Sequence, residues 1–160
     1  MTINVGDKIP QGHLMHMTAD GPGPITTAEL FGGKKVAFVS VPGAFTPTCS
    51  AKHLPGFVEH FDALKAKGVD AIACMAVNDV FVMSAWGKDQ AADDKVLMLA
   101  DGNGEFTKAL GLELDLSGFG MGPRSKRFSM VVDDGVVTHL NVEEGGDFRV
   151  SSAEYMLEQL

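Results

Sequence analysis

The feature that most constrains the fold is a set of three short, almost uninterrupted apolar runs at residues 35–41, 69–77 and 96–100. A strand with one face in water alternates apolar and polar residues, whereas a strand covered on both faces is apolar throughout. Segments with helical spacing of apolar residues separate these runs. Such alternation is typical of a sheet with helices on both faces, so the sequence predicts an α/β sandwich.

Two further apolar runs, at residues 128–133 and 136–140, are joined through Asp133-Asp134-Gly135. A short Asp/Gly-containing connection between two strand-like runs is a hairpin signal. The sequence therefore predicts an antiparallel hairpin at this end of the chain, which makes the central sheet mixed. The order of the strands does not follow from these patterns.

Four helices are predicted. After Cys49, helical spacing holds for Leu54, Phe57, Val58, Phe61 and Leu64. Pro55-Gly56 lies inside this stretch and should kink it or split off its first turn.

The other three helices have recognisable ends. Asn78 or Asp79 can cap a helix that carries Val80, Met83 and Trp86, and a short helix over residues 105–110 should stop at Gly111. Ser151-Ser152-Ala153-Glu154 is a capping-box pattern that opens a helix through Leu160.

Composition limits the functional classes. The 160 residues, of which 45% are hydrophobic, suit one domain spanning residues 1–160. A formal charge of −8 argues against a nucleic-acid partner, and no apolar run approaches the ~20 residues that cross a bilayer.

The first residues resemble neither a signal nor a transit peptide, so we expect a cytoplasmic protein. Two cysteines are too few for a disulfide framework, or for a closed zinc site without histidines.

The candidate reactive group is Cys49, which ends a Pro/Gly-rich turn between the run at residues 35–41 and a helical stretch. This arrangement places the side chain at a helix N-terminus, where unpaired N–H groups favour an anion. Moving a thiol pKa from about 8.5 to about 6 takes roughly 3.4 kcal/mol, whereas a helix N-terminus supplies at most ~2 kcal/mol. A cation close to the sulfur is therefore expected.

Two arginines are candidates for that cation. Arg127 adjoins the run at residues 128–133, so the sheet would hold its backbone, whereas Arg124 lies in the preceding segment. The residues alone favour Arg127 only modestly, and Arg124 is interpreted as a solvated or supporting residue. The Thr46 hydroxyl could donate to the thiolate or to a bound oxygen, and Pro42 would stiffen the turn and shield it from water.

At these residues the chain resembles the peroxiredoxins, thiol peroxidases of thioredoxin-like fold. The family motif Pro-x-x-x-Thr-x-x-Cys is matched by Pro42, Thr46 and Cys49. Similarity to the type II, or peroxiredoxin-5, class extends over nearly the whole chain. It includes residues 41–49 and 53–57, Val77-Asn78-Asp79 with Trp86, and Arg127-Phe128-Ser129-Met130. The resemblance implies a thioredoxin-like three-layer sandwich with a mixed central sheet flanked by helices.

The resemblance also implies roles. Cys49 would attack a hydrogen peroxide or alkyl hydroperoxide oxygen and become a sulfenic acid, with Arg127 polarising the O–O bond. Thr46 would position the peroxide and Pro42 would shield the sulfur. No metal or organic cofactor is required. A homodimer through loops near Phe45 and Trp86 is expected.

Animal members of the class carry a second, resolving cysteine near the C-terminus, whereas Ser151-Ser152 occupies that region here. The other cysteine, Cys74, lies in the run at residues 69–77 and is interpreted as structural. We therefore expect an external thiol as reductant, with glutathione and glutaredoxin as first choice and thioredoxin as second.

Two alternatives remain: a cysteine hydrolase or acyl transferase, and a peroxide-sensing module without turnover. The hydrolase needs a histidine base paired with a carboxylate or amide, and no such pairing is evident. His53 and His60 follow Cys49 but are expected to be exposed or capping residues.

Overall fold

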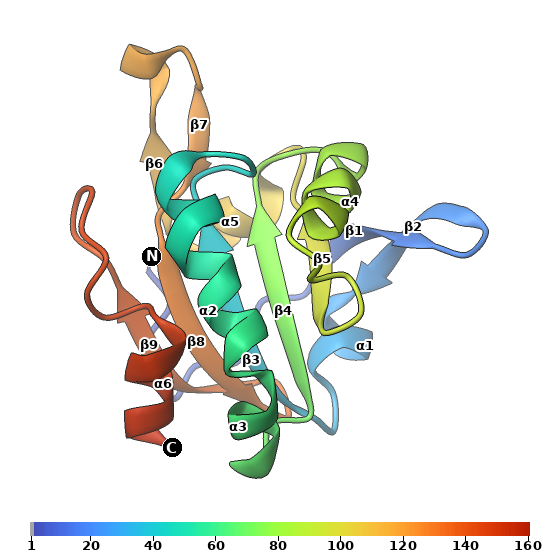
Figure 1. Cartoon of the computed structure of the whole chain (residues 1–160), viewed down its shortest axis with the longest axis vertical. Helices are drawn as coiled ribbons and strands as arrows, with labels where there is room; N and C mark the ends of the chain where they lie inside the picture. The colour runs from blue at the N-terminus through green and yellow to red at the C-terminus, as the bar shows by residue number, and fades with distance from the viewer. Residues whose placement is uncertain (1) are drawn as a thin grey trace.

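The computed structural model describes residues 2–160 and is built around a seven-stranded sheet with the order β2-β1-β5-β4-β3-β8-β9 (Figure 1). Its strands are β1 (His13–Thr18), β2 (Gly21–Thr26), β3 (Lys35–Val41), β4 (Ala71–Ala76), β5 (Val96–Ala100), β8 (Phe128–Asp133) and β9 (Val136–Val142). A second sheet pairs β6 (Glu113–Asp115) with β7 (Pro123–Ser125). The helices are α1 (Thr27–Phe31), α2 (Leu54–Glu59), α3 (Phe61–Ala66), α4 (Val80–Asp89), α5 (Glu105–Leu110) and α6 (Ala153–Gln159).

The centre of the sheet is parallel and its flanks are antiparallel. Strand β4 pairs in parallel with β3 and β5, while β8 pairs antiparallel with β3 and β9. Strands β3, β4 and β5 are buried along nearly their whole length, as their continuous apolar character predicts. The predicted mixed sheet and the β8–β9 hairpin are confirmed.

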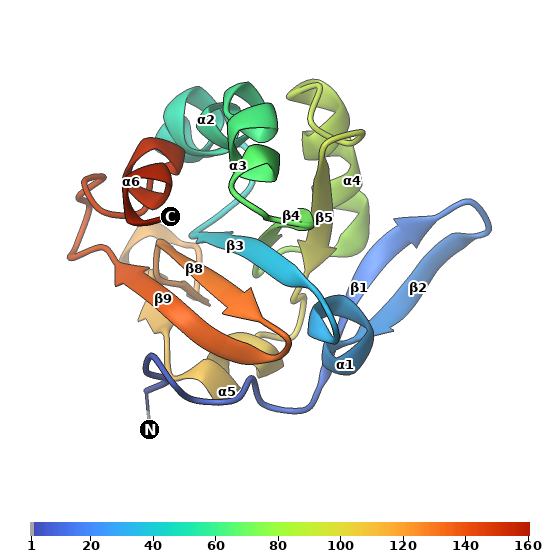
Figure 2. The same ribbon diagram turned by 90° about the horizontal axis from the view of Figure 1, so that it is seen from below.

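Helices cover both faces of the sheet (Figure 2). Helices α2, α3, α4 and α6 lie on one face, and α1 and α5 lie on the other. Each layer has its own apolar core. Leu54, Phe57, Leu64, Met83, Trp86 and Met156 pack on the first face, and Leu30, Phe31, Phe106 and Leu110 pack on the second. The three-layer sandwich is confirmed, and Trp86 is fully buried in the core rather than on a contact surface.

The helical stretch after the turn is broken, as the Pro55-Gly56 pair predicts. Residues Cys49–His53 form a π-helix whose closing bond runs from the N–H of Leu54 to the carbonyl of Cys49, and α2 follows directly with Pro55 in its first turn. Because Pro55 has no N–H, it cannot donate to a carbonyl one turn back, and the wider turn lies immediately before it. A second break at His60 separates α2 from α3.

The β1–β2 and β6–β7 pairs lie outside the predicted strands. Strand β2 reads Gly-Pro-Gly-Pro-Ile-Thr, a sequence that lacks the β-branched pattern of a strand. Its position at the edge of the sheet explains why two prolines are tolerated there. Strands β6 and β7 are three residues each, too short for an alternating pattern.

The C-terminal helix forms as predicted, but its cap differs. Ser152 is the N-cap of α6, with its hydroxyl accepting from the N–H of Tyr155. The expected capping box from Ser151 to Glu154 is therefore wrong, because the Ser151 hydroxyl instead donates to the Glu143 carboxylate at 2.6 Å.

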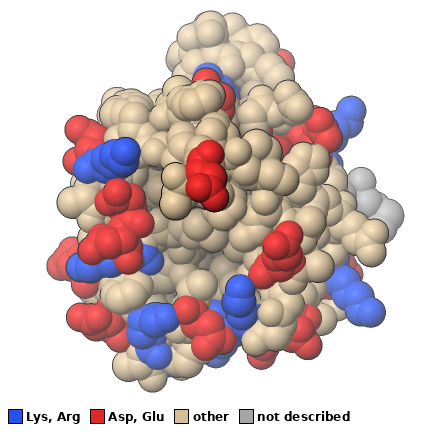
Figure 3. All heavy atoms as spheres, turned by 90° about the vertical axis from the view of Figure 1, so that its right-hand side faces the viewer, with Lys and Arg blue, Asp and Glu red and all other residues tan. Residues whose placement is uncertain are grey.

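On the face shown in Figure 3, acidic and basic side chains are interspersed, without a continuous basic surface. Among residues 2–160, no helix combines the length and the apolar character needed to cross a bilayer.

Candidate active site

The pairing of β3 with β8 brings together the two chain segments that carry the predicted site residues. Ser40, near the end of β3, lies opposite Phe128, the first residue of β8. Because these strands are antiparallel, the turn that follows β3 and the residue that precedes β8 meet at the same edge of the sheet. Cys49 and Arg127 come from these two segments, as the sequence predicts.

Arg127 Nη2 donates a hydrogen bond to Cys49 Sγ at 3.0 Å. The Cys49 side chain is fully buried, whereas Arg127 is half-buried. In such a site the guanidinium charge is only partly screened by water, so it stabilises a negative charge on the sulfur more strongly than a surface cation would.

Cys49 also lies in the first turn of its helix. The N–H of Ser50 donates to the carbonyl of Thr46, four residues earlier, at 2.9 Å. The N–H groups of Thr48 and Cys49 precede that of Ser50 in the chain, in the part of a helix where N–H donors lack intrahelical acceptors. The expected strand–turn–helix placement of the sulfur is therefore present.

The tight turn before Cys49 depends on Gly43 and Thr46. The Thr46 hydroxyl donates its single hydrogen to the Gly43 carbonyl at 2.8 Å, so in this arrangement it does not donate to the sulfur, which was one of the roles expected for it. A Cβ at Gly43 would lie 3.1 Å from Arg124 Nη1 and 3.2 Å from Thr46 Cγ2, which leaves little room for any larger residue. Phe45 has a φ of 65°, a strained value for a non-glycine residue, and the residue is 52% exposed.

Arg124 supports this turn rather than the sulfur. Its Nε donates to the Met121 carbonyl at 2.9 Å, and its Nη1 lies 3.4 Å from the Pro42 carbonyl. Pro42 itself is half-buried, directly after β3. The structure therefore separates the two candidate arginines: Arg127 contacts Cys49, and Arg124 connects the turn to the loop between β6 and β7.

Asn78, just before α4, and Trp86, on the buried face of α4, contact the segment around Cys49. Asn78 Oδ1 accepts from the N–H of Ala44 at 2.9 Å, which leaves Asp79 as the N-cap of α4. Trp86 Nε1 donates to Ser50 Oγ at 3.0 Å, so the only tryptophan is fixed beside Cys49.

His53 lies in the site, and the expectation that it is an exposed or capping residue is wrong. It is fully buried rather than exposed, and its Nδ1 lies 2.8 Å from Arg127 Nη1. Burial, together with the adjacent Arg127 charge, lowers the pKa of His53 to about 3. Its spacing of four residues from Cys49 was the available signal, because residues four apart share one face of a helix. His60, in contrast, is partly exposed and pairs with Glu154 at 2.9 Å.

Glu143 is a second residue that the sequence did not indicate. Its buried carboxylate accepts from the N–H groups of Arg149, Val150 and Ser151 and from the Ser151 hydroxyl. Burial alone would raise the pKa of Glu143, but these hydrogen bonds outweigh it and lower the pKa below its ordinary value. Its backbone N–H also donates to the Arg127 carbonyl at 2.9 Å.

Cys74 lies in β4, fully buried, and both cysteines are free. Burial and the nearby Cys49 raise the pKa of the Cys74 thiol far above its ordinary value. A thiol held protonated in this way is a poor nucleophile, which agrees with a structural role.

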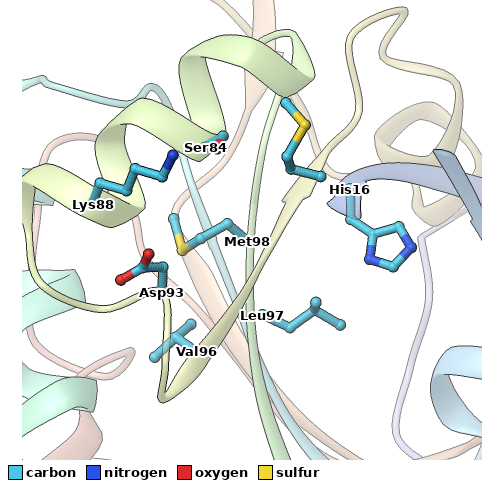
Figure 4. Close-up of a pocket in the computed structure, with 8 residues that line it drawn as sticks. His16, Ser84, Lys88, Asp93, Val96, Leu97 and Met98 are labelled. Atoms are coloured by element: carbon cyan, nitrogen blue, oxygen red, sulfur yellow. The ribbon is translucent and has the colours of Figure 1, made fainter. Parts of the chain in front are cut away.

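A separate hollow of about 220 Å³ lies between α4, β5 and β1 (Figure 4). Its lining includes Ser84 and Lys88 of α4, His16 of β1 and Asp93, and none of the residues around Cys49. Among the described residues, no group of three or more His, Cys, Asp or Glu side chains is placed to hold a metal ion.

Comparisons with known proteins agree with this arrangement. Residues 4–157 match the model of the Redoxin family. The chain is 56% identical over 164 residues to Peroxiredoxin-2E-2, chloroplastic, of Oryza sativa subsp. japonica, covering 99% of this chain and 73% of the relative. It is 52% identical over 161 residues to Peroxiredoxin-2B of Arabidopsis thaliana, covering 99% and 98%.

The same likeness holds in three dimensions. The structure of reduced Prx3 in complex with H2O2 from Vibrio vulnificus is 54% identical, covers 99% of each chain and has a TM-score of 0.96. With its mixed sheet and its cysteine at a helix start, the chain belongs to the Redoxin family and, within it, to the type II peroxiredoxins.

Proposed function

We propose that this peroxiredoxin reduces hydrogen peroxide and small alkyl hydroperoxides through the Cys49 thiolate, and that an external thiol recycles it. The observation that supports this most strongly is the 3.0 Å hydrogen bond from Arg127 Nη2 to Cys49 Sγ. A charged donor beside a buried sulfur favours the thiolate, which is the nucleophilic form.

The first chemical step is a displacement at oxygen. The Cys49 thiolate attacks the terminal peroxide oxygen, an S–O bond forms and the O–O bond breaks. The sulfur is oxidised by two electrons to a sulfenic acid, and the departing oxygen takes up a proton and leaves as water or an alcohol. Arg127, already charged, stabilises the negative charge that develops on the departing oxygen.

Thr46 and Pro42 are proposed to shape the peroxide site. The Thr46 hydroxyl gives its hydrogen to Gly43, so its oxygen remains able to accept a hydrogen bond from the peroxide O–H. Pro42 has no N–H that needs water and stiffens the turn beside the sulfur.

The second half-reaction is proposed to need an external thiol. Cys74 is buried in the central sheet, and its raised pKa makes it a poor attacking group. A thiol from outside would displace water from the sulfenic acid to give a mixed disulfide, and a second thiol would release the Cys49 thiol and a new disulfide. Glutathione with glutaredoxin is the first choice and thioredoxin the second.

The test is peroxide consumption by the wild type, Cys49→Ser and Cys74→Ser, with glutathione and glutaredoxin or with thioredoxin. Turnover by the wild type and Cys74→Ser, but not by Cys49→Ser, is the expected result. Rapid Cys49 oxidation without turnover with either reductant would favour a peroxide sensor instead. A Cys49 that does not react with peroxide would contradict both functions.

A homodimer is also proposed. Phe45 before Cys49, Phe81 in α4 and Phe119 between β6 and β7 are large apolar side chains left exposed in this chain. Burial of such rings is a common basis of association. Sedimentation of the wild type and of Phe45→Asp over a range of protein concentrations tests this. The variant is expected to dissociate into monomers at a higher protein concentration than the wild type. The same dissociation constant for both proteins would contradict a contact through Phe45.

The cytoplasm is the proposed compartment, because both cysteines are free thiols and a reducing setting keeps them so. Detection of the native protein in a subcellular fraction is the direct test.

A further inference from the structure

The proposed chemistry leaves one buried polar side chain beside Arg127 without a role. His53 packs its ring against Phe57 and Phe148, with ring centroids 5.8 Å and 5.0 Å away, and both its nitrogens have polar partners. We propose that His53 is a positioning residue, which holds the Arg127 guanidinium so that Nη2 points at the Cys49 sulfur. This inference rests on the proposed peroxidase function of Cys49.

The partners of His53 fix the position of its proton. Arginine has only N–H donors, so His53 Nδ1 must accept the bond from Arg127 Nη1 at 2.8 Å. The Ser151 carbonyl is only an acceptor, so Nε2 must carry the proton and donate to it at 2.8 Å. The ring is therefore neutral, with one defined tautomer. The low pKa of His53 agrees with this, because burial disfavours the charged ring and a second positive charge would repel Arg127.

This arrangement uses two edges of one guanidinium. Arg127 Nη1 donates to His53, and Nη2 donates to Cys49 at 3.0 Å. The planar guanidinium cannot turn without losing one of these bonds, so the contact with His53 limits the rotation of a long, flexible side chain. Arg127 Cζ also lies over the Phe148 ring, 5.9 Å from its centroid, within the range of a cation–π contact.

Glu143 holds the carbonyl that orients His53. Its carboxylate accepts from three consecutive N–H groups at residues 149–151, and its own N–H donates to the Arg127 carbonyl. The segment after β9 is thereby fixed against both His53 and the backbone of Arg127. The charged groups facing His53 are Arg127 and Glu143.

His53 is not placed to act as a general base. Its one unprotonated nitrogen, Nδ1, is occupied by the Arg127 hydrogen bond, and no hydrogen bond joins it to Cys49 among the described residues. Its effect on the reaction would therefore pass through Arg127, which makes the prediction testable by combining substitutions.

The experiment measures the rate at which hydrogen peroxide oxidises Cys49 in the absence of reductant, by mass spectrometry of quenched samples, together with the ultraviolet absorbance of the thiolate. The variants are His53→Phe, which keeps a ring but removes both polar contacts, and His53→Asn, whose oxygen can replace the Nδ1 acceptor. His60→Phe is the matched control, since this histidine pairs only with Glu154. Each His53 variant is also made in an Arg127→Gln background.

We expect His53→Phe to lower the oxidation rate by about tenfold and to reduce the thiolate absorbance at neutral pH, because a hydrogen bond to a charged group is lost. His53→Asn should recover much of the rate, and His60→Phe should match the wild type. In the Arg127→Gln background, His53→Phe should change the rate by less than about twofold, since groups that act as a unit are not additive.

Equal rates for wild type and His53→Phe would overturn the proposal, as would the same fold-loss in both backgrounds. If His53→Phe does not fold, His53→Asn is compared with His53→Gln, whose nitrogen replaces only the donor to Ser151. The asparagine variant is expected to be faster, and the opposite order would contradict the role of Nδ1. A wild type that does not react with peroxide contradicts the peroxidase itself, which is a separate result.

Discussion

Arg127 and Cys49 are 78 positions apart in the chain, and Arg127 Nη2 donates to Cys49 Sγ at 3.0 Å. This contact exists because β3 and β8 are neighbours and antiparallel, so that their adjoining loops meet at one edge of the sheet. The position of the candidate reactive sulfur relative to its cation therefore depends on the pairing of these two strands in the central sheet.

Replacing Arg127 separates charge from geometry. Arg127→Gln removes the charge and should lower the rate of Cys49 oxidation by roughly 10²-fold, as the loss of one fixed donor at a reacting oxygen does. Arg127→Lys keeps the charge but replaces the planar guanidinium, whose two terminal nitrogens donate separately to His53 and Cys49, with a single nitrogen, so an intermediate rate is expected. Reductant-free oxidation rates measure this, and a lysine variant as fast as wild type would show that the charge alone is sufficient.

Thr46 should act through its oxygen. Thr46→Val keeps the shape of the side chain but removes the bond to Gly43 and the acceptor for a peroxide hydrogen, so the oxidation rate should fall about tenfold or more. Thr46→Ser keeps the hydroxyl and should retain most of the rate. Valine and serine variants with equal rates would remove Thr46 from the peroxide site.

The stability of the protein should decrease in acid because of His53. Its pKa is near 6.5 in an unfolded chain and about 3 in the folded one, so below about pH 6.5 the unfolded chain binds the extra proton. This contribution to the free energy of unfolding falls by up to ~1.4 kcal/mol per pH unit between those values. Glu143, whose pKa is lowered in the folded protein, adds to this loss as the pH falls below its ordinary value of 4.5.

Urea unfolding over a pH series measures this effect. The curve for His53→Asn should be flatter than that of the wild type from pH 6.5 downward, because asparagine does not titrate. The same slope in both proteins would mean that His53 is not held neutral in the folded state.

Cys74 should matter for stability but not for turnover. Cys74→Ser places a hydroxyl in a fully buried strand, which costs roughly 1–3 kcal/mol when no partner is available. The peroxidase rate should stay within about twofold of wild type. Thermal unfolding and steady-state turnover check the two parts, and a large loss of turnover in a folded variant would give Cys74 a role in recycling.

Much of the fold follows from local patterns. The apolar runs of β3, β4 and β5 and the turn before β9 identify the buried sheet, since continuous apolar character reports burial on both faces. The β1–β2 hairpin does not follow, because the prolines of β2 are tolerated only by its edge position. Strand order depends on long-range packing, which no local pattern contains.

The site also contains residues that a local pattern indicates and residues whose contacts depend on long-range packing. Cys49, Thr46 and Pro42 lie in one short segment, and the need for a cation indicated an arginine beside β8. Spacing places His53 on the same helix face as Cys49, but its burial and the contacts of Glu143 could not be predicted, because both depend on where the segment at residues 148–151 packs. A histidine looks the same in sequence whether it is exposed or, as His53 is, held between Arg127 and Ser151.

The proposed chemistry requires Cys49 to react as a thiolate beside Arg127. The most direct measurement is the ultraviolet absorbance of the thiolate against pH, in the wild type and Arg127→Gln, with Cys49→Ser subtracted as the blank. A thiolate signal that is present at neutral pH in the wild type, is lost only on acidification and is weakened in Arg127→Gln is the predicted result. A wild-type signal that appears only in alkaline solution, as for an ordinary thiol, would contradict the proposed role of Arg127 and the peroxidase chemistry of Cys49.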